Sequence, residues 1–183
     1  MIVIELQDEA ETAALAGRIA RLAAPGDVIA LAGELGAGKT SFARAFIRAR
    51  GGTEEVPSPT FTLAQAYELG EVTVWHFDFY RLRHADEAWE LAIEDAFHDG
   101  ISLIEWPERL GALLPPRRLH ITLSPGATPD ARRAEIDPGG DSRGDWASRL
   151  ARLASPNSSH PAKAGGQGRP LRLQPRGFPL SRE

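Results

Sequence analysis

The sequence predicts an α/β fold in which helices flank a central sheet of mixed parallel and antiparallel strands. Residues 27–33 form a continuous apolar run that ends in glycine, which is typical of a strand buried on both faces in a parallel sheet. Residues 60–81 instead alternate apolar and polar residues on both sides of Leu69-Gly70, the pattern of an antiparallel pair joined by a tight turn. Both kinds of strand pairing are therefore expected in one sheet.

In chain order, the first expected elements are a strand, a helix and the buried strand. Residues 1–6 indicate a short strand, and residues 8–23 place apolar side chains on one helical face. Pro25 and Gly26 break this helix before the buried strand begins. Residues 39–52 then return to helical spacing until two glycines stop it. A strand, a glycine-rich loop and a helix thus follow one another directly.

The second half of the sequence predicts two further helices and three further strands. In chain order these are a helix at 84–97, a buried strand at 100–106, strands at 117–123 and 132–137 around a loop at 124–130, and a helix at 141–153. Asp141 and Ser142 are candidate caps of the last helix.

The sequence predicts one folded domain, residues 1–153, followed by a flexible tail, residues 154–183. A chain of 183 residues with 42% hydrophobic content suffices for one core. The tail is rich in Pro, Gly and Ser, and its few large apolar residues cannot bury enough surface to order it. Five basic residues against Glu183 give the tail a charge of +4, which leaves −8 on the domain in a chain of net charge −4.

Composition also limits the classes of partner. An acidic domain is a poor match for a duplex-binding surface, so we expect no DNA partner. No run approaches the roughly 18 apolar residues of a membrane span, so we expect no membrane. The sequence contains no cysteine, which makes the reducing cytoplasm the simplest location. Lys39 and Lys163 are the only lysines among many arginines, which indicates that Lys39 has a specific chemical use.

Residues 33–40 match G-x-x-x-x-G-K-[ST], the phosphate-binding P-loop. In such a loop the backbone N–H groups surround phosphates, the lysine reaches the β and γ oxygens, and the hydroxyl binds Mg²⁺. A glycine-rich turn that merely caps a helix is the alternative, but the position between a buried strand and a helix favours a P-loop fold. The expected nucleotide contacts are Gly33, Glu34, Leu35, Gly36, Ala37, Gly38, Lys39, Thr40 and Ser41.

Two acidic residues end apolar strands where P-loop proteins bind the metal or orient water: Asp78 and Glu105. Glu105 is the better metal candidate because its strand is an uninterrupted apolar run. Asp78 is then left to position the attacking water or to complete the metal's surroundings, and the sequence leaves that division open. The alternative for each residue is a solvated carboxylate at a strand end.

Several residues near these motifs are expected to lie beside the site. Ser58, Pro59 and Thr60 belong either to an ordinary proline turn or to a loop that senses the γ phosphate. His76 is more readily a structural histidine than a base. Arg81 either binds phosphate or pairs with a surface carboxylate, Tyr80 continues the same strand, and Trp106 packs either near the nucleotide or in the core.

Four ordered motifs together resemble the bacterial TsaE family, the small P-loop ATPases of tRNA threonylcarbamoyladenosine biosynthesis. The motifs are GELGAGKTSF, VPSPTFTL, HFDFYRL and LIEWPERL, and the resemblance covers residues 1–153. It implies a P-loop NTPase fold with a mixed sheet, ATP and Mg²⁺ as ligands, and TsaB and TsaD partners, of which TsaD performs the transfer. It also implies that Lys39 and Thr40 bind phosphate and metal, Glu105 the metal, and that Asp78 is catalytic or in the metal's surroundings.

The resemblance therefore predicts an ATPase that is slow without its partners and reaches tRNA only through their complex. A small-molecule kinase is one alternative, for which residues 81–84 are the only hint of a lid. The other is a binding module in which ATP merely orders the loop around Ser58. The basic tail departs from the family pattern and is expected to be inert rather than a contact with tRNA or partners.

Overall fold

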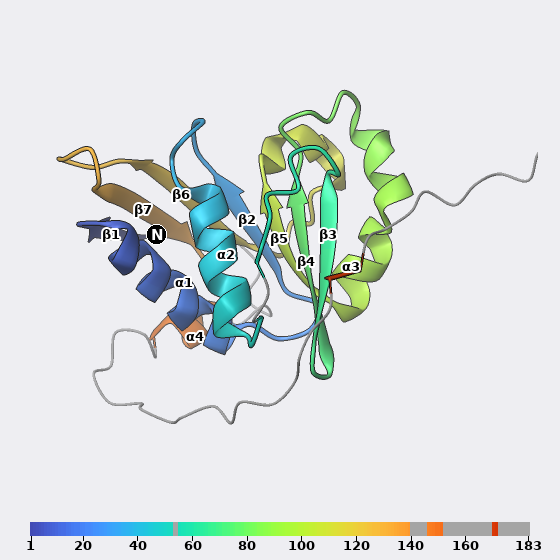
Figure 1. The fold of residues 1–183 in the computed structure, drawn as a ribbon, viewed down its shortest axis with the longest axis horizontal. Helices are drawn as coiled ribbons and strands as arrows, with labels where there is room; N and C mark the ends of the chain where they lie inside the picture. Colours follow the sequence, from blue (N-terminus) through green and yellow to red (C-terminus); the bar gives the residue numbers. More distant parts are fainter. Residues whose placement is uncertain (53–54, 140–145, 152–169, 172–183) are drawn as a thin grey trace, which may run out of the picture.

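The computed structural model describes residues 1–52, 55–139, 146–151 and 170–171, and it forms one mixed sheet with helices on both faces (Figure 1). The strands are β1 (Ile2–Leu6), β2 (Val28–Ala32), β3 (Ala64–Leu69), β4 (Val72–Asp78), β5 (Ile101–Glu105), β6 (Leu119–Pro125), β7 (Arg132–Asp137) and β8 (Pro170–Leu171). The helices are α1 (Glu9–Leu22), α2 (Lys39–Ala49), α3 (Ile93–Asp99) and α4 (Trp146–Ala151), with 3₁₀ helices η1 (Ala85–Leu91) and η2 (Pro107–Leu113).

The strand order is β1-β7-β6-β2-β5-β4-β3-β8. Strands β6, β2, β5 and β4 are parallel to one another, and β1, β7, β3 and β8 add antiparallel pairs at the two sides. The predicted mixed sheet is therefore confirmed. Strands β2 and β5 are central because their apolar runs must be covered on both faces, and all five residues of β5 are buried.

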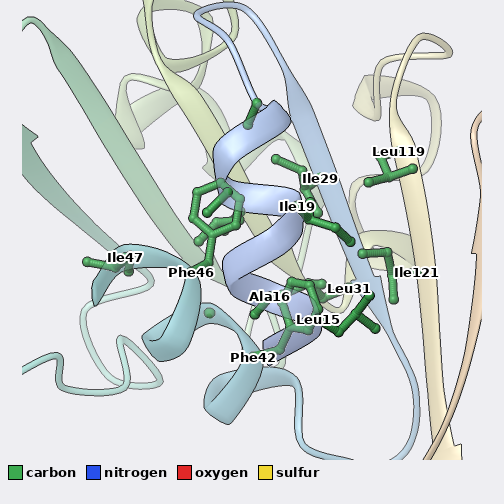
Figure 2. Packing of buried hydrophobic residues seen from close by; sticks show 14 of the residues in the cluster. Leu15, Ala16, Ile19, Ile29, Leu31, Phe42, Phe46, Ile47, Leu119 and Ile121 are labelled. Carbon is green, nitrogen blue, oxygen red and sulfur yellow. The ribbon is translucent and has the colours of Figure 1, made fainter. Parts of the chain in front are cut away.

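One face of the sheet is covered by α1 and α2 (Figures 1 and 2). Leu15 and Ile19 of α1 pack with Phe42 and Phe46 of α2 against Ile29 and other apolar residues of β2 and β6. Asp8 begins α1 as its N-cap, accepting the Glu11 backbone N–H at 2.8 Å. On the opposite side, Val28 of β2, Phe77 of β4 and Ile104 of β5 belong to a second cluster, formed with η1, α3 and η2.

The predicted helix at 84–97 is two elements in the structure. Ala92 adopts φ 56°, so the 3₁₀ helix η1 ends there and α3 begins anew at Ile93. Ala88 and Ile93 are both buried, yet five residues of a continuous α-helix would turn their side chains about 140° apart. The break reorients the chain so that both reach the core, which helical periodicity alone did not indicate.

Most other predicted boundaries agree with the structure within one or two residues. The β3–β4 hairpin turns at Gly70-Glu71, and β5 ends at Glu105 because Trp106 takes a left-handed conformation, φ 58°. Helix α4 is present, whereas its candidate caps Asp141 and Ser142 lie outside the described residues. Of the predicted tail, only the two-residue strand β8 is described, so its flexibility stays a prediction. No described helix is long and apolar enough to cross a membrane.

Candidate functional site

The glycine-rich loop between β2 and α2 has a backbone conformation that residues larger than glycine could not adopt without clashes or strain. Gly33 has φ 135°, and a Cβ there would lie 2.2 Å from the carbonyl oxygen of Leu123 on the neighbouring strand β6. Gly36 faces open space but has φ 80°, a conformation that L residues rarely adopt. The loop thus follows a buried strand, packs against β6 and opens α2, as the predicted phosphate-binding loop requires.

Lys39 is folded over its own loop. Its Nζ donates to the carbonyl oxygens of Gly33 at 2.7 Å and Glu34 at 2.8 Å, and it lies 4.0 Å from the Trp106 ring centroid. The residue is only 4% exposed. Burial lowers the pKa of Lys39 below its ordinary value, against the opposing effect of Glu105 and Asp78. An anion in the loop would offer this ammonium better partners than two carbonyls.

Glu105 joins two other residues at the end of β5. Its Oε2 accepts the Thr40 hydroxyl at 2.9 Å, and its Oε1 lies 2.8 Å from His76 Nε2. Glu105 and His76 are 2% and 0% exposed. The structure therefore brings together the hydroxyl and the carboxylate that the sequence predicted as metal ligands, with the histidine behind them.

Asp78 stands beside Glu105 because β4 and β5 are parallel and pair these two residues in register. Its Oδ2 accepts the Thr60 hydroxyl at 2.7 Å, and its Oδ1 accepts the Tyr80 backbone N–H at 3.0 Å. The Ser58 hydroxyl lies 2.7 Å from that of Thr60 and donates to it, because the Thr60 hydrogen is already given to Asp78. The loop of Ser58, Pro59 and Thr60, the predicted candidate for sensing the γ phosphate, is thus hydrogen-bonded to Asp78.

These groups surround one cavity of about 240 Å³. Its lining consists of Leu35, Gly36, Gly38, Lys39, Thr40, Ser41, Thr60, Asp78, Tyr80, Glu105 and Trp106. The Tyr80 and Trp106 rings pack with centroids 5.0 Å apart. Ser58, Pro59, His76 and Arg81 do not line it: Arg81 lies over the exposed ring of Phe61, 4.6 Å away, instead of facing the loop. None of the described residues that line this cavity is an arginine.

A second cavity, of about 480 Å³, adjoins the first at Gly36, Gly38 and Ser41. It extends to the start of α1 and to the segment before β7. The remaining lining residues are Asp8, Glu9, Ala10, Thr12, Asp130 and Arg132. The glycine loop therefore lies between a cavity with two carboxylates at the strand ends and a second cavity with polar side chains.

Arg132 is a residue of the site that sequence reasoning missed. Its Nε donates to the Ala37 carbonyl oxygen at 3.2 Å, and its Nη1 donates to those of Pro129 and Ala131 at 2.7 Å. The guanidinium therefore ties the glycine loop to the start of β7. Nothing in the local sequence distinguishes Arg132 from Arg133, because the contact arises from the sheet order, which brings positions 95 apart together.

Within the described residues, no three His, Cys, Asp or Glu side chains are grouped to hold a metal by themselves. The fit to Mg²⁺ is instead partial and specific. Thr40 and Glu105 present a hydroxyl and a carboxylate oxygen 2.9 Å apart at the cavity, and oxygen is the ligand type that Mg²⁺ takes. Mg²⁺ usually has few protein ligands and completes its shell with phosphate and water.

Comparisons with known proteins show which family this chain resembles in sequence and fold. The model of the family described as "Threonylcarbamoyl adenosine biosynthesis protein TsaE" matches residues 6–134. A protein of Bacillus subtilis named "tRNA threonylcarbamoyladenosine biosynthesis protein TsaE" is 42% identical over 114 residues, 62% of this chain and 71% of that protein. A Rickettsia felis protein of the same name is 40% identical over 119 residues, 64% of this chain and 70% of that one.

A crystal structure of Bacillus subtilis YdiB has the same architecture. It aligns with a TM-score of 0.69 and 30% sequence identity, and the alignment covers 84% of this chain and 96% of that one. The matched family segment includes the glycine loop, both strand-end carboxylates and Arg132.

Proposed function

The chain belongs to the TsaE family, and from this premise we propose that it is the subunit that binds and hydrolyses ATP in tRNA threonylcarbamoyladenosine biosynthesis. The observation that carries the proposal is the meeting of four predicted residues in one cavity: Lys39, Thr40, Asp78 and Glu105. A loop shaped for phosphates, with two carboxylates at the ends of adjacent parallel strands, suits phosphoryl transfer from a nucleotide.

The two adjoining cavities supply an orientation for ATP. The β and γ phosphates belong next to Lys39 and Thr40, so the nucleoside must leave the loop on its other side. There the second cavity offers Thr12, Asp8 and Asp130 as hydrogen-bonding groups for a base and a ribose. In this orientation the chain of phosphates crosses the glycine loop from Ser41 towards Glu105.

The four predicted residues of the first cavity then have distinct tasks. Lys39 leaves the carbonyls of Gly33 and Glu34 to bind β and γ oxygens, together with the loop N–H groups. Thr40 and Glu105 hold Mg²⁺, which when bound supplies positive charge to the same oxygens. The Asp78 carboxylate, fixed by Thr60 and the Tyr80 N–H, orients the water that attacks the γ phosphorus. Of the two carboxylates, Glu105 is the one that accepts the Thr40 hydroxyl, so Glu105 rather than Asp78 is the proposed metal ligand.

The rim of the cavity favours a protein partner. Leu35 is 77% exposed and Phe61 82% exposed, and Tyr80 is partly exposed between the cavity and solvent. Large apolar side chains held in water at one edge are typical of an interface that a partner covers. We propose that TsaB and TsaD proteins bind here, that the TsaD partner performs the transfer, and that tRNA is contacted only through the complex. Without an arginine in the cavity, hydrolysis by the isolated chain is expected to be slow.

The test measures phosphate release from ATP and tRNA modification with purified TsaB and TsaD proteins. The wild-type chain should hydrolyse ATP slowly alone and faster with both partners, and Lys39→Ala should abolish both activities. Glu105→Ala should bind nucleotide without hydrolysing it. If Glu105→Ala supports modification fully, the chain is a binding module, and if the γ phosphate appears on a metabolite, it is a kinase. Either result contradicts the proposal.

A further inference from the structure

His76 lies behind the candidate metal carboxylate, one layer deeper than the cavity. It comes from β4, is fully buried, and does not line the cavity of about 240 Å³. Its Nε2 lies 2.8 Å from Oε1 of Glu105. A carboxylate oxygen accepts only, so the hydrogen between the two atoms belongs to Nε2.

The surroundings of the second ring nitrogen of His76 bear on the role of this histidine. His76 Nδ1 is buried and has no hydrogen-bond partner among the described residues. A buried nitrogen without a partner costs free energy, and an apolar side chain of similar size would fill the same space without that cost. Among the described residues, the one hydrogen bond of the His76 side chain is thus directed at Glu105, and packing alone does not explain an imidazole here.

The two oxygens of Glu105 are therefore unequal. Oε1 is held from inside by His76, whereas Oε2 faces the cavity and accepts the Thr40 hydroxyl. A cation at Thr40 needs Oε2, and the hydrogen bond at Oε1 fixes the carboxylate in the orientation that presents it. Groups that hold a metal ligand from behind in this way commonly change metal affinity by 10- to 100-fold when they are removed.

We propose that His76 is a positioning residue that orients the Glu105 carboxylate for Mg²⁺ through a hydrogen bond from Nε2. The inference rests on the proposed function, because it concerns the Mg²⁺ that accompanies the nucleotide. His76 itself touches neither phosphate nor metal in this arrangement. Its loss should weaken the contribution of Mg²⁺ while leaving the contacts of the glycine loop with the nucleotide intact.

The chain permits a matched pair of substitutions. In His76→Gln the amide nitrogen falls where Nε2 lies, whereas in His76→Asn it falls where Nδ1 lies, so both are polar but only the first donates to Glu105. Calorimetry on the full chain measures the affinity for ADP in EDTA and its gain on adding Mg²⁺. The affinity in EDTA should be the same for all three proteins. The gain from Mg²⁺ should be close to wild type in His76→Gln and about 10- to 100-fold smaller in His76→Asn.

The outcomes separate this inference from the proposed function. If the wild-type chain binds no adenine nucleotide, the proposed function is wrong. If it binds ADP with a gain from Mg²⁺ that His76→Asn retains in full, the positioning role is wrong. A second readout needs no variant: ¹⁵N NMR of the wild-type histidine rings should show a hydrogen on Nε2 of His76, and a ring whose only hydrogen is on Nδ1 would overturn the inference.

Discussion

Asp78 and Glu105 stand opposite each other in register at the ends of two parallel strands, yet each is hydrogen-bonded to a different threonine. Glu105 accepts from Thr40 on the helix that begins at the phosphate loop. Asp78 accepts from Thr60 on the loop before β3. On this difference, rather than on their shared position, we base the proposal that Glu105 binds the metal and Asp78 orients the water, and it leads to the first prediction.

Thr60→Val should uncouple nucleotide binding from hydrolysis. The substitution keeps the shape of the side chain but removes the hydroxyl that joins Ser58 to Asp78. We expect affinity for ATP to stay within a few-fold of wild type and the partner-stimulated rate to fall by about tenfold or more. Phosphate release with TsaB and TsaD measures this effect. Thr62→Val is the control, since Thr62 is exposed nearby, and an equal loss in both variants would contradict the prediction.

Arg132→Ala should loosen the phosphate loop. The change removes hydrogen bonds from a charged donor to the Ala37 carbonyl and to the turn before β7, contacts that are typically worth about 1.5–3 kcal/mol each. We expect roughly tenfold weaker ADP binding by calorimetry, and a lower melting temperature. Arg133→Ala removes only exposed pairs with Glu5 and Glu135 and should change neither. Unchanged ADP affinity in Arg132→Ala would show that the loop holds its shape unaided.

The buried Lys39 predicts a pH dependence of stability without nucleotide. Because burial lowers its pKa below the ordinary 10.5, the folded chain binds fewer protons than the unfolded chain between the two pKa values. Stability therefore rises with pH in that window. The melting temperature of the wild type minus that of Lys39→Met should increase as the pH rises towards the ordinary pKa of 10.5. A constant difference would mean that Lys39 is not desolvated, and bound ADP should flatten the wild-type trend.

Phe61→Ser should weaken partner binding and leave nucleotide binding unchanged. Phe61 is a large exposed apolar side chain next to Thr60, which lines the cavity, and buried aromatic residues dominate many interfaces. We expect about tenfold or greater loss of affinity for the TsaB and TsaD pair in a pull-down titration. Trp89→Ser is the matched control, because Trp89 is exposed on η1 and lines a separate cavity. Equal losses in both variants would place the partner elsewhere.

Breaking the pair of Arg149 and Asp27 should destabilise the domain without touching the site. The guanidinium donates to both oxygens of the nearly buried Asp27, at 2.6 and 2.9 Å, and thereby anchors α4 beside the end of α1. Removing one partner of such a pair leaves a buried charge and typically costs about 3–5 kcal/mol. Urea unfolding of Arg149→Leu measures the cost. A loss of ADP affinity in folded protein would contradict the purely structural role.

The parts of the fold that sequence predicted best are those with a local cause. The buried run of β2, the glycines of the loop and the alternation of β3 and β4 each depend on neighbouring residues, and all are confirmed. The break at Ala92 was missed because it depends on what Ala88 and Ile93 pack against. Arg132 was missed for the same reason, since the pairing of β6 with β7 decides which arginine reaches the loop.

The candidate site divides in the same way. The motif predicted Lys39 and Thr40, and strand ends predicted Asp78 and Glu105, which the structure brings into one cavity. The sequence placed His76 and Arg81 beside the site without distinguishing their surroundings. The pleat of β4 turns His76 inwards to Glu105, whereas Arg81, beyond the end of that strand, lies on Phe61. The alternation along a strand predicts which face of the sheet a side chain is on, but it does not predict which residue that side chain contacts there.

The contacts that hold the phosphate loop against β6 and β7 also determine at what point during translation the site can form. Gly33 packs on Leu123 of β6, and Ala37 is held by Arg132 of β7, so the loop leans on strands translated about ninety residues after it. A nascent chain that has only β2, the loop and α2 has every residue of the motif, but it lacks the strands β6 and β7 against which the loop packs. Nucleotide binding during translation would therefore appear only once β7 has emerged, and would report that β6 and β7 have joined the sheet.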